Sequence, residues 1–265
     1  MEAFLFKGDF QTSTNKIKNG ADDIMTVLSE VQLGKKYFKE IGGFPPSKII
    51  HELNEYNGEN QVCVACTQLN GEEVKVLFPD LKSYSERDKK RILKEWIDFL
   101  TTNTKALKAL HFNSRVSQAL FDAACYQENL EELRFKWGVY SDLSALEKLS
   151  NLKFLYIGQG SSVQDIAVLG ELKSLIVLHV EAFKKIEDYS TLTTLENLEQ
   201  LVITGPILGV TPLKDLEFLR EMPNLRFILI SNVTIKKKYT PEELVNLRVA
   251  VPNLHDINNC IFGSN

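Results

Sequence analysis

Residues 152–157, Leu-Lys-Phe-Leu-Tyr-Ile, carry the pattern that decides the fold, Leu-x-x-Leu-x-apolar. The pattern recurs through the second part of the chain, with starts at Leu107, Leu130, Leu152, Leu175, Leu198, Leu225 and Leu254. Successive starts are 23, 22, 23, 23, 27 and 29 residues apart, and five of them directly follow an asparagine: Asn129, Asn151, Asn197, Asn224 and Asn253. A unit of this length cannot bury its apolar face alone and must stack on its neighbours. The sequence therefore predicts a solenoid over residues 105–260.

Each unit is expected to contain one short strand and one turn of helix. The last positions of the pattern alternate between inward and outward residues, which is the period of a β-strand. We expect parallel strands near 109–112, 132–135, 154–157, 177–180, 200–203 and 227–230, with a seventh near 256–258. Between strands, apolar residues recur at every third position, as at Leu143, Leu146 and Leu149, which favours 3₁₀ turns.

A resemblance to a known repeat class follows from these segments. The stretches 140–146, 163–166 and 210–213, each leading to a further Asn-Leu or Ser-Leu, resemble the 22-residue repeats of internalins and related bacterial leucine-rich repeat proteins. The resemblance covers about residues 105–260 and implies an α/β fold: a leucine-rich repeat solenoid with a parallel sheet on the concave face, preceded by a small α+β N-terminal region. One family feature is missing, because no Asn stands eight residues after the first Leu of any unit. We therefore carry over the solenoid and no internalin receptor contact.

The chain is expected to divide at residue 82. Residues 83–265 form the leucine-rich repeat domain, which begins with an amphipathic capping helix over 86–101 and has a second helix starting at Thr240-Pro241 behind the last strand. Residues 1–82 form an α+β region in which we recognise no family. Helices are expected over 22–41 and 47–56, and strands 61–67 and 73–78 flank Asn70-Gly71, which is a hairpin signal.

Composition and charge exclude several classes of protein. The 265 residues are 44% apolar and 25% charged, and 31 basic against 35 acidic residues give a net charge of −4. This balance does not favour a nucleic acid partner, and no apolar run reaches the length of a membrane span. The first residues lack a Sec-type signal peptide, so a cytoplasmic location is the expectation, with signal-independent export left open.

The sequence offers little catalytic chemistry. Cys63 and Cys66 have the spacing of a zinc or dithiol pair, but they lie in an apparent strand and no other ligands complete a site. The four histidines, His51, His111, His179 and His255, have no metal-binding spacing, and no nucleotide-binding or hydrolase motif is present. We expect no cofactor, no metal and no enzymatic activity.

The outward positions of the strands suggest where a partner binds. They form one column of Ala109, Glu132, Phe154, Val177, Gln200, Phe227 and Asp256, and a second of His111, Arg134, Tyr156, His179, Val202, Leu229 and Asn258. Apolar and aromatic residues gather in units three to six, where a solvated face would be polar, so we expect an exposed patch there. The predicted partner-binding residues are Arg134, Phe154, Tyr156, Val177, His179, Val202, Phe227 and Leu229.

The resulting functional hypothesis is a protein-protein interaction module that binds a protein partner through the concave face. The alternatives are an enzymatic or ligand-binding N-terminal domain with the repeats as a specificity arm, and a carbohydrate-binding or self-assembling protein. Two bland explanations of the patch also remain: residues 1–80 fold back over it, or a second copy of the chain covers it as a homodimer.

Overall fold

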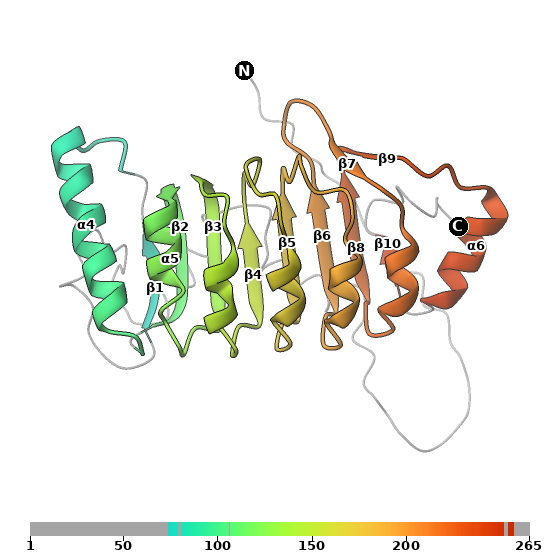
Figure 1. Ribbon diagram of the computed structural model, residues 1–265, viewed down its shortest axis with the longest axis horizontal. Coiled ribbons are helices and arrows are strands. Elements are labelled where there is room, and N and C mark those ends of the chain that lie inside the picture. The colour runs from blue at the N-terminus through green and yellow to red at the C-terminus, as the bar shows by residue number, and fades with distance from the viewer. Residues whose placement is uncertain (1–73, 79–80, 106, 252–253, 257–265) are drawn as a thin grey trace, which may run out of the picture.

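The computed structural model describes residues 74–78, 81–105, 107–251 and 254–256. In Figure 1 the strands lie side by side along the long axis of the molecule, with helices and 3₁₀ turns on one side of them. Eight strands form one sheet in the order β1-β2-β3-β4-β5-β6-β8-β10, and every neighbouring pair is parallel. The predicted solenoid with a parallel sheet is therefore confirmed.

The strands occupy the predicted positions. They are β1 (Val74–Phe78), β2 (Leu107–Ser117), β3 (Glu132–Val139), β4 (Phe154–Ile157), β5 (Val177–Glu181), β6 (Gln200–Thr204), β8 (Phe227–Ser231) and β10 (His255–Asp256). A second, two-stranded parallel sheet pairs β7 (Thr211–Leu213) with β9 (Val233–Ile235). The first two repeat strands run past their predicted ends, because β2 and β3 continue their pairing from Arg115 to Ser117 beyond an irregularity in register.

The strand β1 lies at the edge of the same sheet. Its residues were expected to form one arm of a hairpin, and the structure pairs them with β2 in parallel. The other expected arm, 61–67, lies outside the described residues. Since β1 comes from the region assigned to the N-terminal unit, the sheet continues across the expected domain boundary at residue 82.

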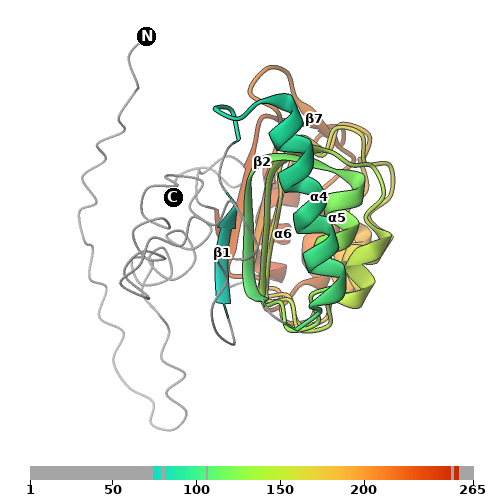
Figure 2. The same ribbon diagram turned by 90° about the vertical axis from the view of Figure 1, so that its left-hand side faces the viewer.

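Helical elements cover the opposite side of the sheet, which is the convex side of the solenoid (Figure 2). They are α4 (Glu86–Thr102), α5 (Gln118–Ala124), the 3₁₀ turns η3 (Ser144–Lys148), η4 (Ala167–Glu171), η5 (Ser190–Thr194) and η6 (Glu217–Glu221), and α6 (Pro241–Ala250). The core lies between the two layers, where the inward leucines of successive units stack. In β3, β4, β5 and β6 these are Leu133, Leu155, Leu178 and Leu201, each paired in register with the next and fully buried.

Both predicted capping helices are present. In α4, the Ser85 side chain accepts a hydrogen bond from the Asp88 N–H, and Trp96 and Leu100 are fully buried. Gln127 closes the other end of α4 by donating from Nε2 to the carbonyl of Leu100 at 2.8 Å. At the far end of the solenoid, Thr240 and Glu243 form a complete capping box at the start of α6.

The asparagines that precede the repeat starts tie neighbouring units together. Each donates a hydrogen bond from its side-chain Nδ2 to a backbone carbonyl of the preceding unit: Asn129 to Lys105, Asn151 to Glu128, Asn197 to Lys173 and Asn224 to Glu196, at 2.8–3.1 Å. We call these four residues the asparagine ladder. In the unit that starts at Leu175, the Ser174 hydroxyl makes the equivalent bond to the carbonyl of Ser150 at 2.7 Å. Because the carbonyls lie between strands, they have no partner in the sheet, and the ladder satisfies them.

Candidate protein-binding face

The outward residues form two parallel columns on the concave side of the sheet. The strand pairing places Phe154 beside Val177, Val177 beside Gln200, and Gln200 beside Phe227. The second column runs through Arg134, Tyr156, His179, Val202 and Leu229 in the same way. The structure thus brings together all eight predicted partner-binding residues on one face, on neighbouring strands about 4.8 Å apart.

The expected exposure of this face is wrong. Phe154, Val177 and Phe227 retain only 7%, 3% and 6% of their accessible surface, and Val202, Arg134 and His179 are also buried. Tyr156 and Leu229 are half-buried. Closely spaced strands shield the flanks of each side chain, but the tips are shielded only when something lies over the face. A prediction from the columns alone could not include that cover.

Phe154, Val177 and Phe227 form an apolar cluster separate from the main core, and Tyr156 and Ile176 pack against it. The Arg134 guanidinium lies 4.9 Å from the centroid of the Phe154 ring and 6.0 Å from that of Tyr156. Burial lowers the pKa of Arg134 to about 10, so this side chain remains charged at neutral pH. The face therefore presents a cation stacked on aromatic rings beside an aliphatic strip.

A chain of polar contacts holds the second column in place. The Tyr156 hydroxyl donates to Glu181 Oε2 at 2.6 Å, and Gln159 Nε2 donates to Glu181 Oε1 at 2.9 Å. The His179 ring stacks on Tyr156 with centroids 4.4 Å apart, and its Nε2 lies 3.2 Å from Thr204 Oγ1. Burial, and secondarily the charge of Arg134, lower the pKa of His179 to about 3, so the ring is neutral at physiological pH.

Two polar groups on this face lack partners among the described residues. Gln200 keeps only 1% of its accessible surface, and neither its Nε2 nor its Oε1 has a hydrogen-bond partner there. The Nδ1 of His179, on the neighbouring strand β5, is buried without one as well. A buried polar group without a hydrogen bond costs about 1–3 kcal/mol. Gln200 and His179 therefore offer unmet hydrogen-bonding capacity in the middle of the apolar strip.

We expect Gln200→Met to stabilise the free protein by about 1 kcal/mol, because it replaces an unpaired buried amide with an apolar side chain of similar length. Urea unfolding followed by circular dichroism measures the difference. The matched control is Gln127→Met, which removes an amide whose Nε2 is hydrogen-bonded to the carbonyls of Leu100 and Asn103 and should destabilise. Equal destabilisation by both variants would show that Gln200 is hydrogen-bonded in the folded chain.

The sequence identified most of this face and missed part of it. Gln200 was placed in the first column and yet was not among the predicted binding residues, although a polar residue between Val177 and Phe227 was a signal for it. Glu181 was expected only at the polar rim, and the hydrogen bonds that join it to Tyr156 and Gln159 were not foreseen. Gln159 adopts a left-handed backbone conformation, with φ of 57°, just after β4, and nothing in the repeat pattern indicates that turn.

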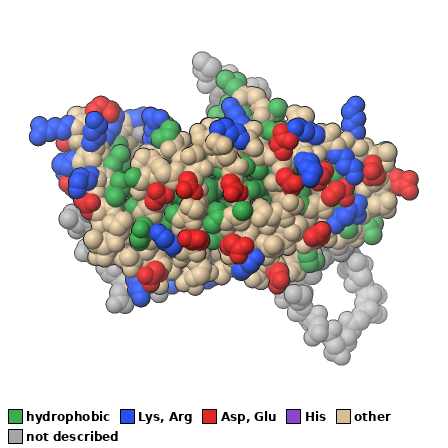
Figure 3. Space-filling view, viewed as in Figure 1, with side chains coloured by type: hydrophobic (Ala, Val, Ile, Leu, Met, Phe, Trp, Pro, Cys, Tyr) green, Lys and Arg blue, Asp and Glu red, His purple; other side chains and the backbone are tan. Residues whose placement is uncertain are grey.

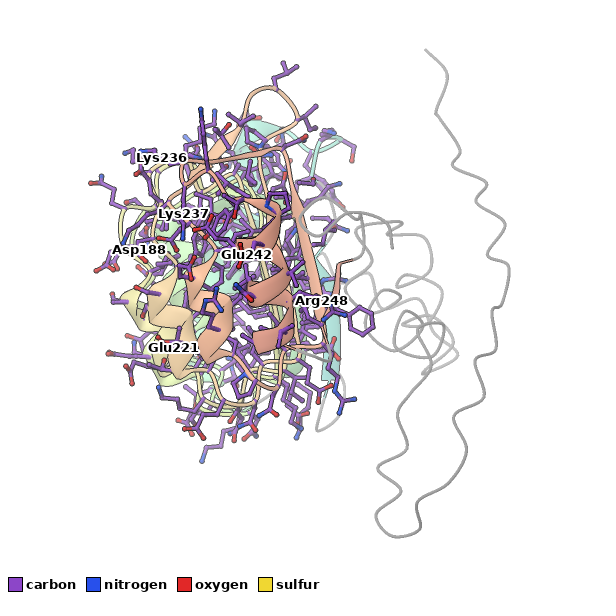
Figure 4. The ribbon with its side chains drawn as sticks, turned by 90° about the vertical axis from the view of Figure 1, so that its right-hand side faces the viewer. Asp188, Glu221, Lys236, Lys237, Glu242 and Arg248 are labelled. Carbon is purple, nitrogen blue, oxygen red and sulfur yellow. The ribbon has the colours of Figure 1, made fainter. Side chains whose placement is uncertain are left out.

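The helix side and the C-terminal end differ from this face. Acidic and basic side chains are interspersed over the helix side (Figure 3). At the C-terminal end, Figure 4 shows Lys236, Lys237, Asp188 and Glu242 beside one another around α6. Lys237 lies 2.7 Å from Glu217, and Lys236 lies 2.6 Å from Glu187. Such mixed charge gives no single-sign surface of the kind that attracts a polyanion.

The other residues that suggested chemistry contribute no site within the described ranges. Cys63, Cys66, His51 and Cys260 lie outside the described residues. Cys125 is fully buried directly after α5, and burial raises the pKa of its thiol, which makes it a core residue. No group of three or more possible metal ligands occurs in the described part of the chain. Within the same residues, no helix has both the length and the apolar content of a membrane span.

Comparisons with known proteins add a likeness in fold. No family model matches the chain, and no curated protein matches its sequence. Among solved structures, an internalin C2 from Listeria monocytogenes is 22% identical over 62% of this chain and 64% of that chain, with a TM-score of 0.44. An internalin F from the same species is 18% identical over 57% of this chain and 46% of that chain, with a TM-score of 0.45.

A third similar structure, that of PEPR1-AtPEP1, is 14% identical, with a TM-score of 0.37, and the match covers 57% of this chain and 28% of that chain. In each of the three comparisons the match spans less than two thirds of the solved chain. The fold assignment itself rests on this chain's own repeat, register and winding. On that evidence, the chain is a leucine-rich repeat solenoid.

Proposed function

We propose that this chain is a protein-interaction module whose concave face binds an extended segment of a partner protein. The observation that carries the proposal is the unpaired amide of Gln200, set between the buried apolar side chains of Val177 and Phe227. A primary amide has one donor and one acceptor side by side, which match the C=O and N–H of a polypeptide main chain. Apolar neighbours on both sides supply the contact area that makes such a bond selective.

The proposed contact residues have distinct roles. Phe154, Val177 and Phe227 contact apolar side chains of the partner, and Gln200 and the Nδ1 of His179 bond to its main chain. Arg134 and Tyr156 are the residue types that carry most of the affinity in protein interfaces, because they combine large contact area with a polar group. Val202 and Leu229 complete the second column. A rigid sheet lowers the entropic cost of binding, since little of it must become ordered.

The experiment compares what the full-length chain and its variants retain from an extract of the source organism. Wild type, Tyr156→Ala and Tyr126→Ala are used as baits, and the recovered proteins are quantified by mass spectrometry. Tyr126 is a matched control because it is 41% exposed and contacts Lys148 in η3, on the helix side. A true partner is retained by wild type and by Tyr126→Ala and is depleted with Tyr156→Ala.

For a partner identified in this way, Tyr156→Ala and Phe227→Ala should each weaken binding by about 1 kcal/mol or more, which is at least about fivefold in Kd. Isothermal titration with purified full-length proteins gives the affinities. Unchanged affinity in the double variant, with an unchanged circular dichroism spectrum, would remove the concave face as the binding site and direct attention to residues 1–73.

A further inference from the structure

The concave face is covered in the free chain. Side chains of both columns are buried from Ala109 and His111 on β2 to Phe227 on β8. The described helices all lie on the other side of the sheet, as Figure 2 shows, so none of them can shield these tips. Some other part of the same chain must lie over the face, because the burial exists without a partner.

The size of the buried area limits which segment can cover it. From β2 to β8 the sheet order gives five strand spacings, or roughly 24 Å, and the two columns are roughly 7 Å apart along the strands. Residues 257–265 are nine residues and span at most about 30 Å when fully extended. As a single extended strand, they cannot shield two columns over that length. Residues 1–73 are long enough, and they enter the described structure at β1, on the edge of the same sheet.

We propose that residues 1–73 pack against the concave face of the free protein, so that a partner binds there only by displacing them. The inference concerns the free chain and does not depend on the proposed function. The sequence of this segment suits the role: Ile24, Leu28 and Val31 are spaced as one apolar stripe of the expected helix over 22–41. That stripe needs an apolar surface, and the Phe154, Val177 and Phe227 cluster is one.

The unpaired groups explain how such a cover can be displaced. No described residue satisfies the Gln200 amide or the His179 Nδ1. A partner that bonds to them therefore gains interactions that the described structure does not contain. The N-terminal segment has the advantage of being tethered, which raises its effective concentration at the face. Binding of a partner then depends on the difference between the two sets of contacts.

The test is site-specific photo-crosslinking of the purified full-length chain, without any partner. A photoreactive residue is introduced as Phe227→p-benzoylphenylalanine, which keeps an aromatic ring at the position. After irradiation, the crosslinked peptides are mapped by mass spectrometry. We expect an intramolecular crosslink to residues 1–73 at the mass of the monomer, with a yield independent of protein concentration. The matched control, Tyr126→p-benzoylphenylalanine on the helix side, should give no crosslink to that segment.

Every other pattern would overturn the inference. A dimer whose yield rises with concentration would assign the face to a second copy, a crosslink to residues 257–265 would assign it to the C-terminal tail, and no crosslink would leave it open to solvent. The half-buried position Tyr156→p-benzoylphenylalanine provides a second site if the first variant does not fold, as judged by circular dichroism. Because no partner is present, failure here leaves the affinity measurements of the proposed function unaffected.

Discussion

Leu155→Asp should unfold the protein at least in part at 25 °C. Leu155 is fully buried on β4 and is paired in register with Leu133 and Leu178. The change removes the stacked apolar side chain and leaves a carboxylate without a partner in the core, which costs several kcal/mol. Together with the cavity, we expect a loss of at least about 5 kcal/mol, against a total stability of about 5–15 kcal/mol for a typical domain.

Circular dichroism and urea unfolding measure this loss. Leu155→Met is the matched control, since it keeps the volume and should cost less than about 1.5 kcal/mol. Leu155 lies midway along the sheet, so the aspartate separates the units on either side, and unfolding can occur in two steps. If the aspartate variant melted within a degree of the wild type, the inward position of Leu155 would be refuted.

Phe135→Ala should destabilise the protein by about 3–5 kcal/mol. The Phe135 ring on β3 is fully buried and lies against three other aromatic rings, with centroid distances of 5.6 Å to Phe112, 4.7 Å to Phe121 and 5.8 Å to Tyr140. Truncation leaves a cavity at the junction of β2, α5 and β3 and removes these ring contacts. Aromatic pairs contribute about 0.5–1.5 kcal/mol beyond the area that they bury.

Calorimetry of the variant gives the change in Tm and in unfolding enthalpy. Phe135→Leu serves as the control, because it keeps an apolar side chain at the site and should lose much less stability. Phe227→Ala provides a second comparison, since Phe227 belongs to the concave cluster and not to the main core. A loss below about 1 kcal/mol for Phe135→Ala would mean that the surrounding rings close the cavity at little cost.

The repeat was enough to predict the architecture because its register is local. Every unit carries its own Leu-x-x-Leu-x-apolar segment, so the strand, its inward residues and its parallel neighbours follow from spacing alone. The pairing of Leu155 with Leu133 and Leu178 confirms this directly. The caps were predictable for the same reason, since Ser85 and Thr240 act on residues three positions away.

The burial of the concave face was not predictable in this way. An outward position such as Phe154 or Val177 has the same sequence signature whether the face is open or covered, and the difference depends on residues far away along the chain. The parallel pairing of β1 is also non-local, because Asn70-Gly71 is a turn signal that carries no information about β2. The partner-binding role of Arg134, Tyr156 and the other six residues stays a prediction.

The asparagine ladder has a consequence for how such a chain can change in length. Each ladder residue bonds only to the unit before it, as Asn151 does to Glu128 and Asn197 does to Lys173. A whole unit duplicated or deleted by recombination therefore brings or removes its own side-chain bond and leaves the next junction with an equivalent carbonyl to accept one. The central units can in this way be gained or lost as modules, and the length of the concave face can change in steps of about 4.8 Å without redesign of the ends.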